Sequence, residues 1–187
     1  MAESSRWSRI IVAGVITGAV MVAFNRGGED TPPARSSVVP SRIDIPSLGI
    51  KAPLMKLGVT DGQIDLPPYE KPDMAGWVKD SAIPGDPGSA VILGHVDTKT
   101  DPAVFYKLKD IREGQVVKVV RSDGRTAQYR VDSVEQVDKN SFPADKVYLE
   151  DGLRLITCGG NFDWDKHEYR DNVIVYATLV TPAGSRA

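Results

Sequence analysis

Short apolar runs separated by turn-forming residues make up most of the chain from Ser41 onward. The runs lack the periodicity of about 3.6 residues that marks an amphipathic helix, so we expect strands. The expected strands are 42–45, 50–54, 76–78, 90–96, 115–121, 127–137, 153–157 and 172–180. Eight short strands with turns at regular intervals predict an all-β sandwich or barrel rather than an α/β sheet.

Two local signals add detail to this pattern. The pair Asp123-Gly124 lies between the fifth and sixth runs and is typical of a tight hairpin turn, because these residue types tolerate a positive φ. The segment 104–108 follows Asp101-Pro102 and is expected to form a short helix. A hairpin is therefore predicted between the fifth and sixth strands.

The N-terminal region has a different pattern. Residues 10–24 are apolar or small and carry no charge, and Arg6 and Arg9 precede them. No small-x-small cleavage site follows the run, which favours an uncleaved signal anchor over a removed signal peptide. The two arginines predict a cytoplasmic front end, so the remainder of the chain is expected outside the cell membrane as a single-pass protein.

We therefore expect five parts in the chain. They are a cytoplasmic N-terminus at 1–9, a transmembrane helix at 10–24, a disordered tether at 25–40, a folded domain at 41–182 and a tail at 183–187. The tether is expected to be disordered because it is rich in Pro, Gly and Ser and has little apolar surface to bury.

Charge narrows the function classes. Lys and Arg total 23 and Asp and Glu total 25, so the chain is nearly neutral. Proteins that bind nucleic acid carry a basic surplus that meets the phosphates, and this chain has none. Nucleic acid is therefore not an expected partner.

Candidate chemistry centres on Cys158, which is the only cysteine. A single cysteine excludes an intramolecular disulfide, and an unpaired thiol in an exported protein is open to oxidation. Cys158 follows the seventh expected strand, and Gly159 and Gly160 after it leave room for close backbone approach. These features favour a reactive thiol at a strand end.

A thiol with an ordinary pKa of about 8.5 needs a neighbouring cation to favour the thiolate. His95 lies near the end of the fourth expected strand, and Arg170 lies just before the eighth. Asp97 would share a face with His95 if that strand continued. We therefore expect His95, Cys158 and Arg170 to meet at one rim of the sheet.

Two other readings of these residues remain open. Cys158 also fits a small, inert core residue, in which case the chain is a tethered β-domain that binds a cell-wall component without chemistry. Arg170 also fits a surface ion pair with Asp163, Asp165 or Asp171.

A metal-dependent hydrolase that uses His95 and His167 is a further alternative. The spacing of the two histidines matches no common zinc motif, and the acidic segment 161–168 lacks the pattern of an EF-hand. We expect that segment to be a solvated loop.

Three motifs, in this order, resemble the sortase family of cysteine transpeptidases. They are Gly94-His95-Val96-Asp97, Leu155-Ile156-Thr157-Cys158 and Tyr169-Arg170-Asp171-Asn172. Arg154 stands where the family's TLxTC pattern begins with Thr. Together with the His-Val-Asp and Cys-Gly-Gly triplets, this departure is similar to the actinobacterial class F rather than to the housekeeping class A.

The resemblance implies an eight-stranded, mostly antiparallel β-barrel with short helices, preceded by the transmembrane helix. It implies that Cys158 is the nucleophile, that His95 is the acid and base, and that Arg170 stabilises the oxyanion and positions the substrate. Thr157 is expected to line the substrate site beside the cysteine. The resemblance implies no metal or other cofactor.

The implied reaction is acyl transfer in two steps. The thiolate attacks an LPxTG-like sorting signal of a secreted protein between Thr and Gly and forms a thioester. An amine then takes the acyl group, and a peptidoglycan precursor or a pilin lysine is the expected acceptor. Hydrolysis by water is the side reaction.

Overall fold

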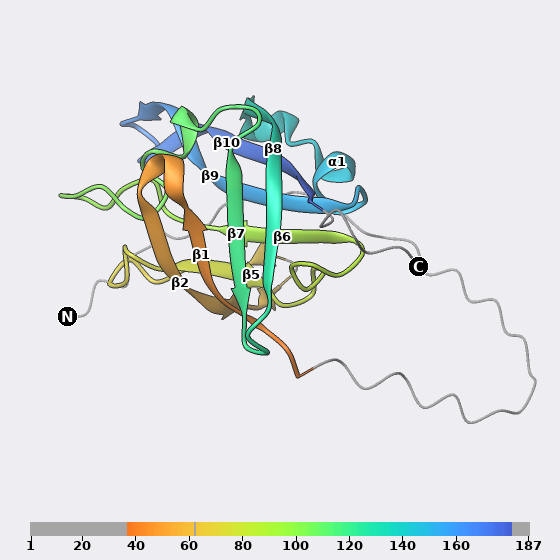
Figure 1. Cartoon of the computed structure of the whole chain (residues 1–187). Coiled ribbons are helices and arrows are strands. Elements are labelled where there is room, and N and C mark those ends of the chain that lie inside the picture. Colours follow the sequence, from red (N-terminus) through yellow and green to blue (C-terminus); the bar gives the residue numbers. More distant parts are fainter. Residues whose placement is uncertain (1–36, 62, 181–187) are drawn as a thin grey trace, which may run out of the picture.

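Strands β1, β2 and β5–β10 close into a barrel in the computed structural model, which describes residues 37–61 and 63–180 (Figure 1). Their order around the barrel is β1-β2-β5-β6-β9-β10-β8-β7. The bounds are β1 Pro40–Ile45, β2 Ile50–Leu57, β5 Ala75–Val78, β6 Ser89–Leu93, β7 Val116–Arg121, β8 Thr126–Asp138, β9 Gly152–Asp163 and β10 Glu168–Leu179. Each expected run overlaps one of these strands, so the predicted β-barrel is confirmed.

The barrel is mostly antiparallel, as expected. The exceptions are β2 with β5 and β6 with β9, which pair in parallel. In the second pair Leu93 lies opposite Ile156, and the Gly94 N–H donates to the Ile156 carbonyl at 3.1 Å. Parallel strands end at the same edge of a sheet, so the chain leaving β6 emerges beside the last part of β9.

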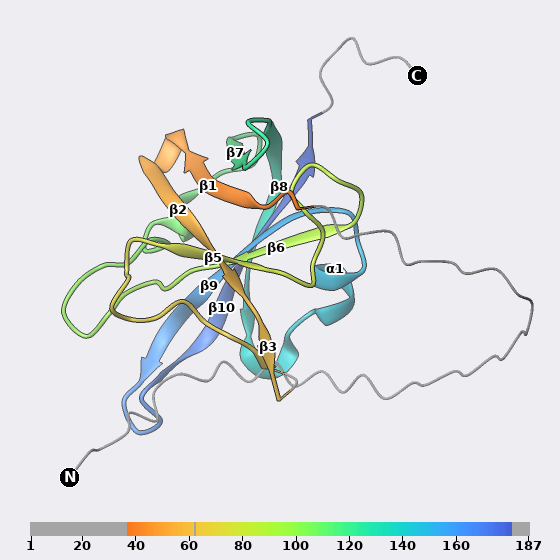
Figure 2. The same cartoon turned by 90° about the horizontal axis from the view of Figure 1, so that it is seen from below.

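Alternation along the strands separates two apolar clusters. The larger cluster fills the barrel and includes Ile92 of β6 and Leu155 of β9. The smaller cluster lies on the outer face and includes Leu93 and Ile156, which are the next residues along those strands. Helix α1, Ala144–Tyr148, covers part of this outer face (Figure 2).

The remaining elements are short. A two-stranded sheet joins β3 Val59–Thr60 to β4 Gln63–Ile64, and three 3₁₀ turns are η1 Pro46–Leu48, η2 Leu108–Asp110 and η3 Lys139–Ser141. The helix expected at 104–108 is wrong, because tertiary contacts use its backbone groups. The Val104 N–H donates to the Pro72 carbonyl at 2.7 Å, and the Phe105 N–H donates to the His95 carbonyl at 3.0 Å.

The β9–β10 hairpin is longer than expected, and it projects from the barrel (Figure 2). The solvated loop expected at 161–168 is reduced to the turn between Asp163 and Glu168, so Cys158 lies within β9 rather than at its end. The reason is a β-bulge at Gly160, whose φ of 73° lets pairing resume after a shift in register.

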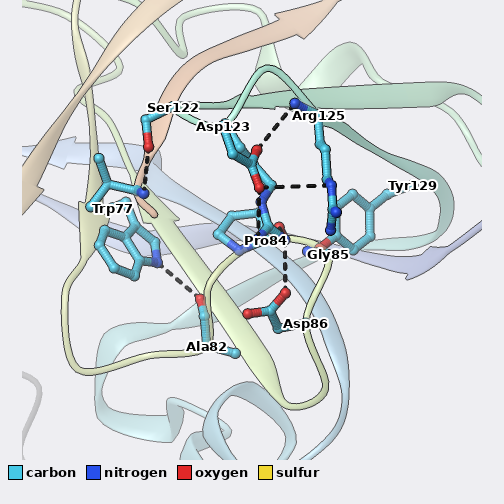
Figure 3. Close-up of polar contacts among 11 residues, drawn as sticks. Trp77, Ala82, Pro84, Gly85, Asp86, Ser122, Asp123, Arg125 and Tyr129 are labelled. Atoms are coloured by element: carbon cyan, nitrogen blue, oxygen red, sulfur yellow. Dashed lines mark hydrogen bonds and ion pairs between the residues drawn. The ribbon is translucent and has the colours of Figure 1, made fainter. Parts of the chain in front are cut away.

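The end of β7 and the start of β8 are tied to the segment between β5 and β6 by polar contacts (Figure 3). The Arg121 guanidinium donates to the Asp86 carboxylate at 2.7 Å, and the Gly85 N–H donates to the Tyr129 hydroxyl at 2.7 Å. Gly124 has a φ of 80°, which agrees with the predicted Asp-Gly turn between β7 and β8.

The expected cytoplasmic part at 1–9 and the membrane helix at 10–24 lie outside the described residues, as do most of the tether at 25–40 and the tail at 183–187. Within 37–61 and 63–180, no helix is long and apolar enough to cross a membrane. Pro40, the last residue of the expected tether, is the first residue of β1.

Candidate active site

Cys158 lies opposite Asn172 of β10 and faces the outside of the barrel. Its direction follows from the alternation along β9, since Leu155 belongs to the inner cluster and Ile156 to the outer one. The cysteine is partly exposed and forms no disulfide. Its thiol therefore opens onto the outer face of the wall formed by β6, β9 and β10.

His95 follows the end of β6 by two residues, just after the last parallel pair of β6 with β9, Leu93 and Ile156. Because Leu93 pairs with Ile156, two further residues along each chain bring His95 level with Cys158. The topology thus brings together two residues that lie far apart in the sequence. We expected both residues at strand ends. His95 does lie just beyond β6, whereas Cys158 lies within β9.

The imidazole of His95 is held from one side by Pro67 and Tyr69 of the connection between β4 and β5, which the sequence pattern did not indicate. Its Nε2 lies 2.6 Å from the Pro67 carbonyl oxygen, and the Tyr69 ring stacks on it with centroids 4.2 Å apart. A carbonyl oxygen only accepts, so Nε2 carries a proton and Nδ1 is the nitrogen that gains or loses one. Burial lowers the pKa of His95, while the Pro67 contact and the charge of Asp97 act in the opposite direction.

Charges around the thiol come from three segments. Burial raises the pKa of Cys158, Lys139 of η3 lowers it, and Asp97 and Glu168 raise it further. The Lys139 ammonium also lies 3.4 Å from the Glu168 carboxylate, which offsets part of its effect. The thiol is therefore mainly protonated in the free protein at neutral pH.

Asp97 and Tyr169 join the histidine segment to β10. The Tyr169 hydroxyl donates to the Asp97 carboxylate, across 72 residues of sequence. The Tyr169 ring also packs edge-on against Phe162 of β9, with centroids 5.2 Å apart. Burial and this hydrogen bond raise the pKa of Tyr169, so the hydroxyl stays a donor. This contact links the segments that carry His95, Cys158 and Arg170.

Arg170 lies at the bulge, where two residues of β9 face one of β10. Its side chain is 62% exposed, and one guanidinium nitrogen lies 3.2 Å from the Asp163 carboxylate. The surface ion pair with Asp163 is thus present, and the exposed guanidinium remains on the same hairpin as Cys158. The described contacts of the Arg170 side chain are to Asp163, and none joins it to the Cys158 side chain.

Thr157 is buried at 2% exposure and faces the barrel interior, on the opposite side of β9 from Cys158. Its hydroxyl has no hydrogen-bond partner in the described part of the chain. Thr157 therefore lies behind the cysteine, and its side chain does not line the outer face.

A pocket opens on the outer face beside Cys158, and sequence analysis did not identify it. The lining residues are Ile64, Leu66, Leu93, Phe142, Tyr148, Ile156 and Asn172. They come from β4 and the connection that follows it, from β6, β9 and β10, and from the connection between β8 and β9, so only the tertiary structure unites them. The one available signal was a polar Asn at the start of the expected strand 172–180, directly before the apolar run 173–177.

Arg154, which stands where the family's pattern has Thr, is buried beneath the outer-face connection. Its guanidinium donates to the carbonyls of Glu150 and Asp151 at 3.0 and 3.2 Å. These are carbonyls just after α1, so Arg154 holds the segment that carries Tyr148. Arg154 thus stabilises one wall of the pocket.

The metal-dependent alternative finds no support in the described residues. Between 37 and 61 and between 63 and 180, no three His, Cys, Asp or Glu side chains are grouped as metal ligands would be. His167 lies in the turn of the β9–β10 hairpin, with a φ of 55°.

The fold and site define a closed β-barrel with a single thiol beside a buried histidine and an apolar pocket. Residues 43–180 match the family model of the sortase domain. This match covers most of the chain, and the chain belongs to the sortase family.

Solved sortase structures share the fold. Sortase C-1 from Actinomyces oris is 23% identical with a TM-score of 0.60, over 75% of this chain and 73% of that one. Sortase C of Streptococcus pneumoniae is 18% identical with a TM-score of 0.59, over 76% and 68%. The pilus-related sortase C of Group B Streptococcus is 21% identical with a TM-score of 0.57, over 80% and 71%. No curated protein matches the chain.

Proposed function

We propose that this protein is a membrane-anchored cysteine transpeptidase that cleaves an LPxTG-like sorting signal between Thr and Gly. The observation that supports it best is the parallel pairing of β6 and β9, whose register, continued by two residues, would set His95 level with Cys158 beside an apolar pocket. Membership of the sortase family supports the reaction class.

In the first step, the Cys158 thiolate attacks the carbonyl carbon of the Thr residue. Negative charge moves to the carbonyl oxygen, where the Arg170 guanidinium stabilises it. The intermediate collapses, the carbon–nitrogen bond breaks, and the imidazolium of His95 gives its Nδ1 proton to the departing glycine amine. The products are an acyl thioester on Cys158, a free glycine amine and a neutral His95.

In the second step, an acceptor amine attacks the thioester carbonyl, and neutral His95 takes the amine proton at Nδ1. The carbon–sulfur bond then breaks, which releases the new amide and restores the thiolate. Water in place of the amine gives hydrolysis. Nε2 stays bonded to the Pro67 carbonyl throughout, so the ring keeps one orientation in both steps.

The pKa directions set the population of the active form. Burial raises the pKa of Cys158 and lowers that of His95, so the neutral pair dominates at neutral pH and the ion pair is a minority. Activity is expected to rise with pH through the pKa of His95 and to fall above the pKa of Cys158.

The proposed setting is the outer face of the cell membrane, with the anchor at 10–24. The proposed donors are secreted proteins with a sorting signal, and the proposed acceptor is a peptidoglycan precursor or a pilin lysine. The pilus-related sortase among the similar structures supports the second acceptor. Arg154, the His-Val-Asp triplet and the Cys-Gly-Gly triplet support a relation to class F.

The alternative of a non-catalytic β-domain is favoured by one observation, which is the raised pKa of the half-buried thiol. Native alkylation with iodoacetamide separates the two. A functional thiol is expected to react in the folded protein, and at a rate that rises with pH. An inert core thiol reacts only after denaturation.

The central experiment offers sorting-signal peptides to the protein with and without an amine acceptor, and reads the products by mass spectrometry. Cleavage between Thr and Gly and an acceptor-dependent amide are expected, and Cys158→Ala abolishes both. Arg170→Lys keeps the charge but loses the planar fork, so we expect the rate to fall about 10²-fold or more without unfolding. Cleavage by Cys158→Ala would overturn the nucleophile assignment.

A further inference from the structure

The Asn172 side chain carries a buried oxygen that accepts no hydrogen bond from the described residues. Asn172 is 2% exposed, and its Oδ1 has no hydrogen-bond partner among residues 37–61 and 63–180. The same side chain lines the outer-face pocket, whose other lining residues are aliphatic or aromatic. An acceptor is thus buried in a mainly apolar pocket, and no donor among the described residues bonds to it.

Such an arrangement is unfavourable for folding. Most buried polar atoms in native proteins are paired, and leaving one unpaired costs its desolvation free energy. An apolar residue of similar size would fit this pocket without that cost. The pocket has a volume of about 20 Å³, roughly the room for one water or a small substituent, and Asn172 lines it, so a group that enters the pocket lies next to the amide.

The position of Asn172 relative to the Cys158 thiol indicates which part of a bound substrate would lie closest to Asn172. Asn172 lies directly opposite Cys158 in the β9–β10 pairing, and both face outward. Side chains directly opposite in an antiparallel pair have Cβ atoms about 4.5–5.5 Å apart. A residue held by its carbonyl at the Cys158 sulfur is therefore the nearest part of any substrate to Asn172.

We propose that Asn172 is a specificity-determining residue that accepts a hydrogen bond from the residue acylated onto Cys158. The proposal rests on the proposed function and adds a contact to its substrate, in which the Thr acylated onto Cys158 donates to the Asn172 oxygen. The peptide N–H and the hydroxyl of that Thr both qualify, since the oxygen requires only a donor within reach.

The test compares wild type with Asn172→Leu on three peptides. One is the parent signal, one has Val in place of the Thr before the scissile bond, and one replaces the N–H of that Thr by an ester oxygen. We expect wild type to lose about tenfold in kcat/KM on one modified peptide, as for one hydrogen bond, and Asn172→Leu to lose that discrimination. Asn161→Leu, an exposed asparagine of β9, is the matched control and keeps it.

If wild type and Asn172→Leu showed the same ratios of kcat/KM between the parent and both modified peptides, the proposal would be overturned.

Thermal unfolding gives a readout that does not depend on activity. Asn172→Leu is expected to raise the melting temperature, because it removes an unpaired buried acceptor, whereas a lower one would show that Asn172 is structural. Binding of the same peptides to Cys158→Ala tests recognition separately from turnover. If Cys158→Ala bound the three peptides with different affinities while wild type cleaved none of them, the proposed reaction would be refuted. The role of Asn172 in recognition would still stand.

Discussion

At the level of single residues, burial in the barrel wall makes both Cys158 and His95 harder to ionise. Cys158 is half-buried in the outer wall and His95 is buried under Tyr69, so burial opposes the thiolate and the imidazolium alike. Charged neighbours modify this effect. Asp97 acts on both groups, because its carboxylate raises the pKa of His95 and also that of Cys158.

Replacing Asp97 by Asn removes that charge while leaving an oxygen that accepts from Tyr169. Since the carboxylate raises both pKa values, its loss is expected to lower both. The two limbs of the pH profile of kcat/KM should move to lower pH, and so should the midpoint of Cys158 alkylation. The groups facing the thiol that remain charged are Lys139 and Glu168.

The matched control is Asp110→Asn, an exposed carboxylate of η2. It is expected to leave both curves in place. An alkylation midpoint that stays unchanged or moves to higher pH in Asp97→Asn would show that Asp97 does not act on the thiol.

At the level of elements, the β9–β10 hairpin carries most of the site. Cys158 and Asn172 pair across it, and Arg170 lies at its bulge. The bulge depends on Gly160, whose positive φ suits glycine. A Cβ at Gly160 would also overlap the Asp171 carboxylate, which accepts a hydrogen bond from Gln136 of β8.

Gly160→Ala is therefore expected to lower the free energy of unfolding by about 1 kcal/mol for the backbone and by more for the overlap. Gly124→Ala separates the two causes, because Gly124 has a similar φ of 80° with open space around its Cβ position. Denaturant titration should show a larger loss for Gly160→Ala, and kcat/KM should fall only in that variant. Equal losses and unchanged turnover would mean that the bulge does not position Arg170.

At the level of the whole molecule, the barrel core fixes the segment that carries His95. Phe105 is fully buried in the inner cluster, and its N–H donates to the His95 carbonyl at 3.0 Å. Its ring also packs against Gly94, where an added Cβ would lie 2.5 Å from a ring carbon. The packing of Phe105 in the core thus also fixes the backbone of the segment that carries His95.

Phe105→Ala is expected to lower the free energy of unfolding by about 3–5 kcal/mol, since it leaves a cavity in a closed core. Phe105→Leu fills most of that space and should cost clearly less. Urea titration gives both values, and kcat/KM measured under conditions where both variants are folded should fall more for Ala. If kcat/KM did not depend on the residue at position 105, packing of Phe105 would not position His95.

The sequence by itself determined the strands, the Asp123-Gly124 turn and the three motifs that identify the family. These features are local, since alternation and turn residues specify strands, and each motif lies within four consecutive residues. They correctly predicted the barrel. They did not predict the length of the hairpin, because its bulge depends on the fit of Gly160 against Asp171.

The tertiary structure alone decided how the site is built. The Pro67 contact to His95 spans 28 residues and the Tyr169 contact to Asp97 spans 72, so no local pattern indicates either. The pocket unites segments from distant parts of the chain, and Asn172 enters it only because β9 and β10 pair in one register. A shift of one residue would turn each side chain to the other face of the wall, which is why register, rather than composition, determines what lies beside the thiol.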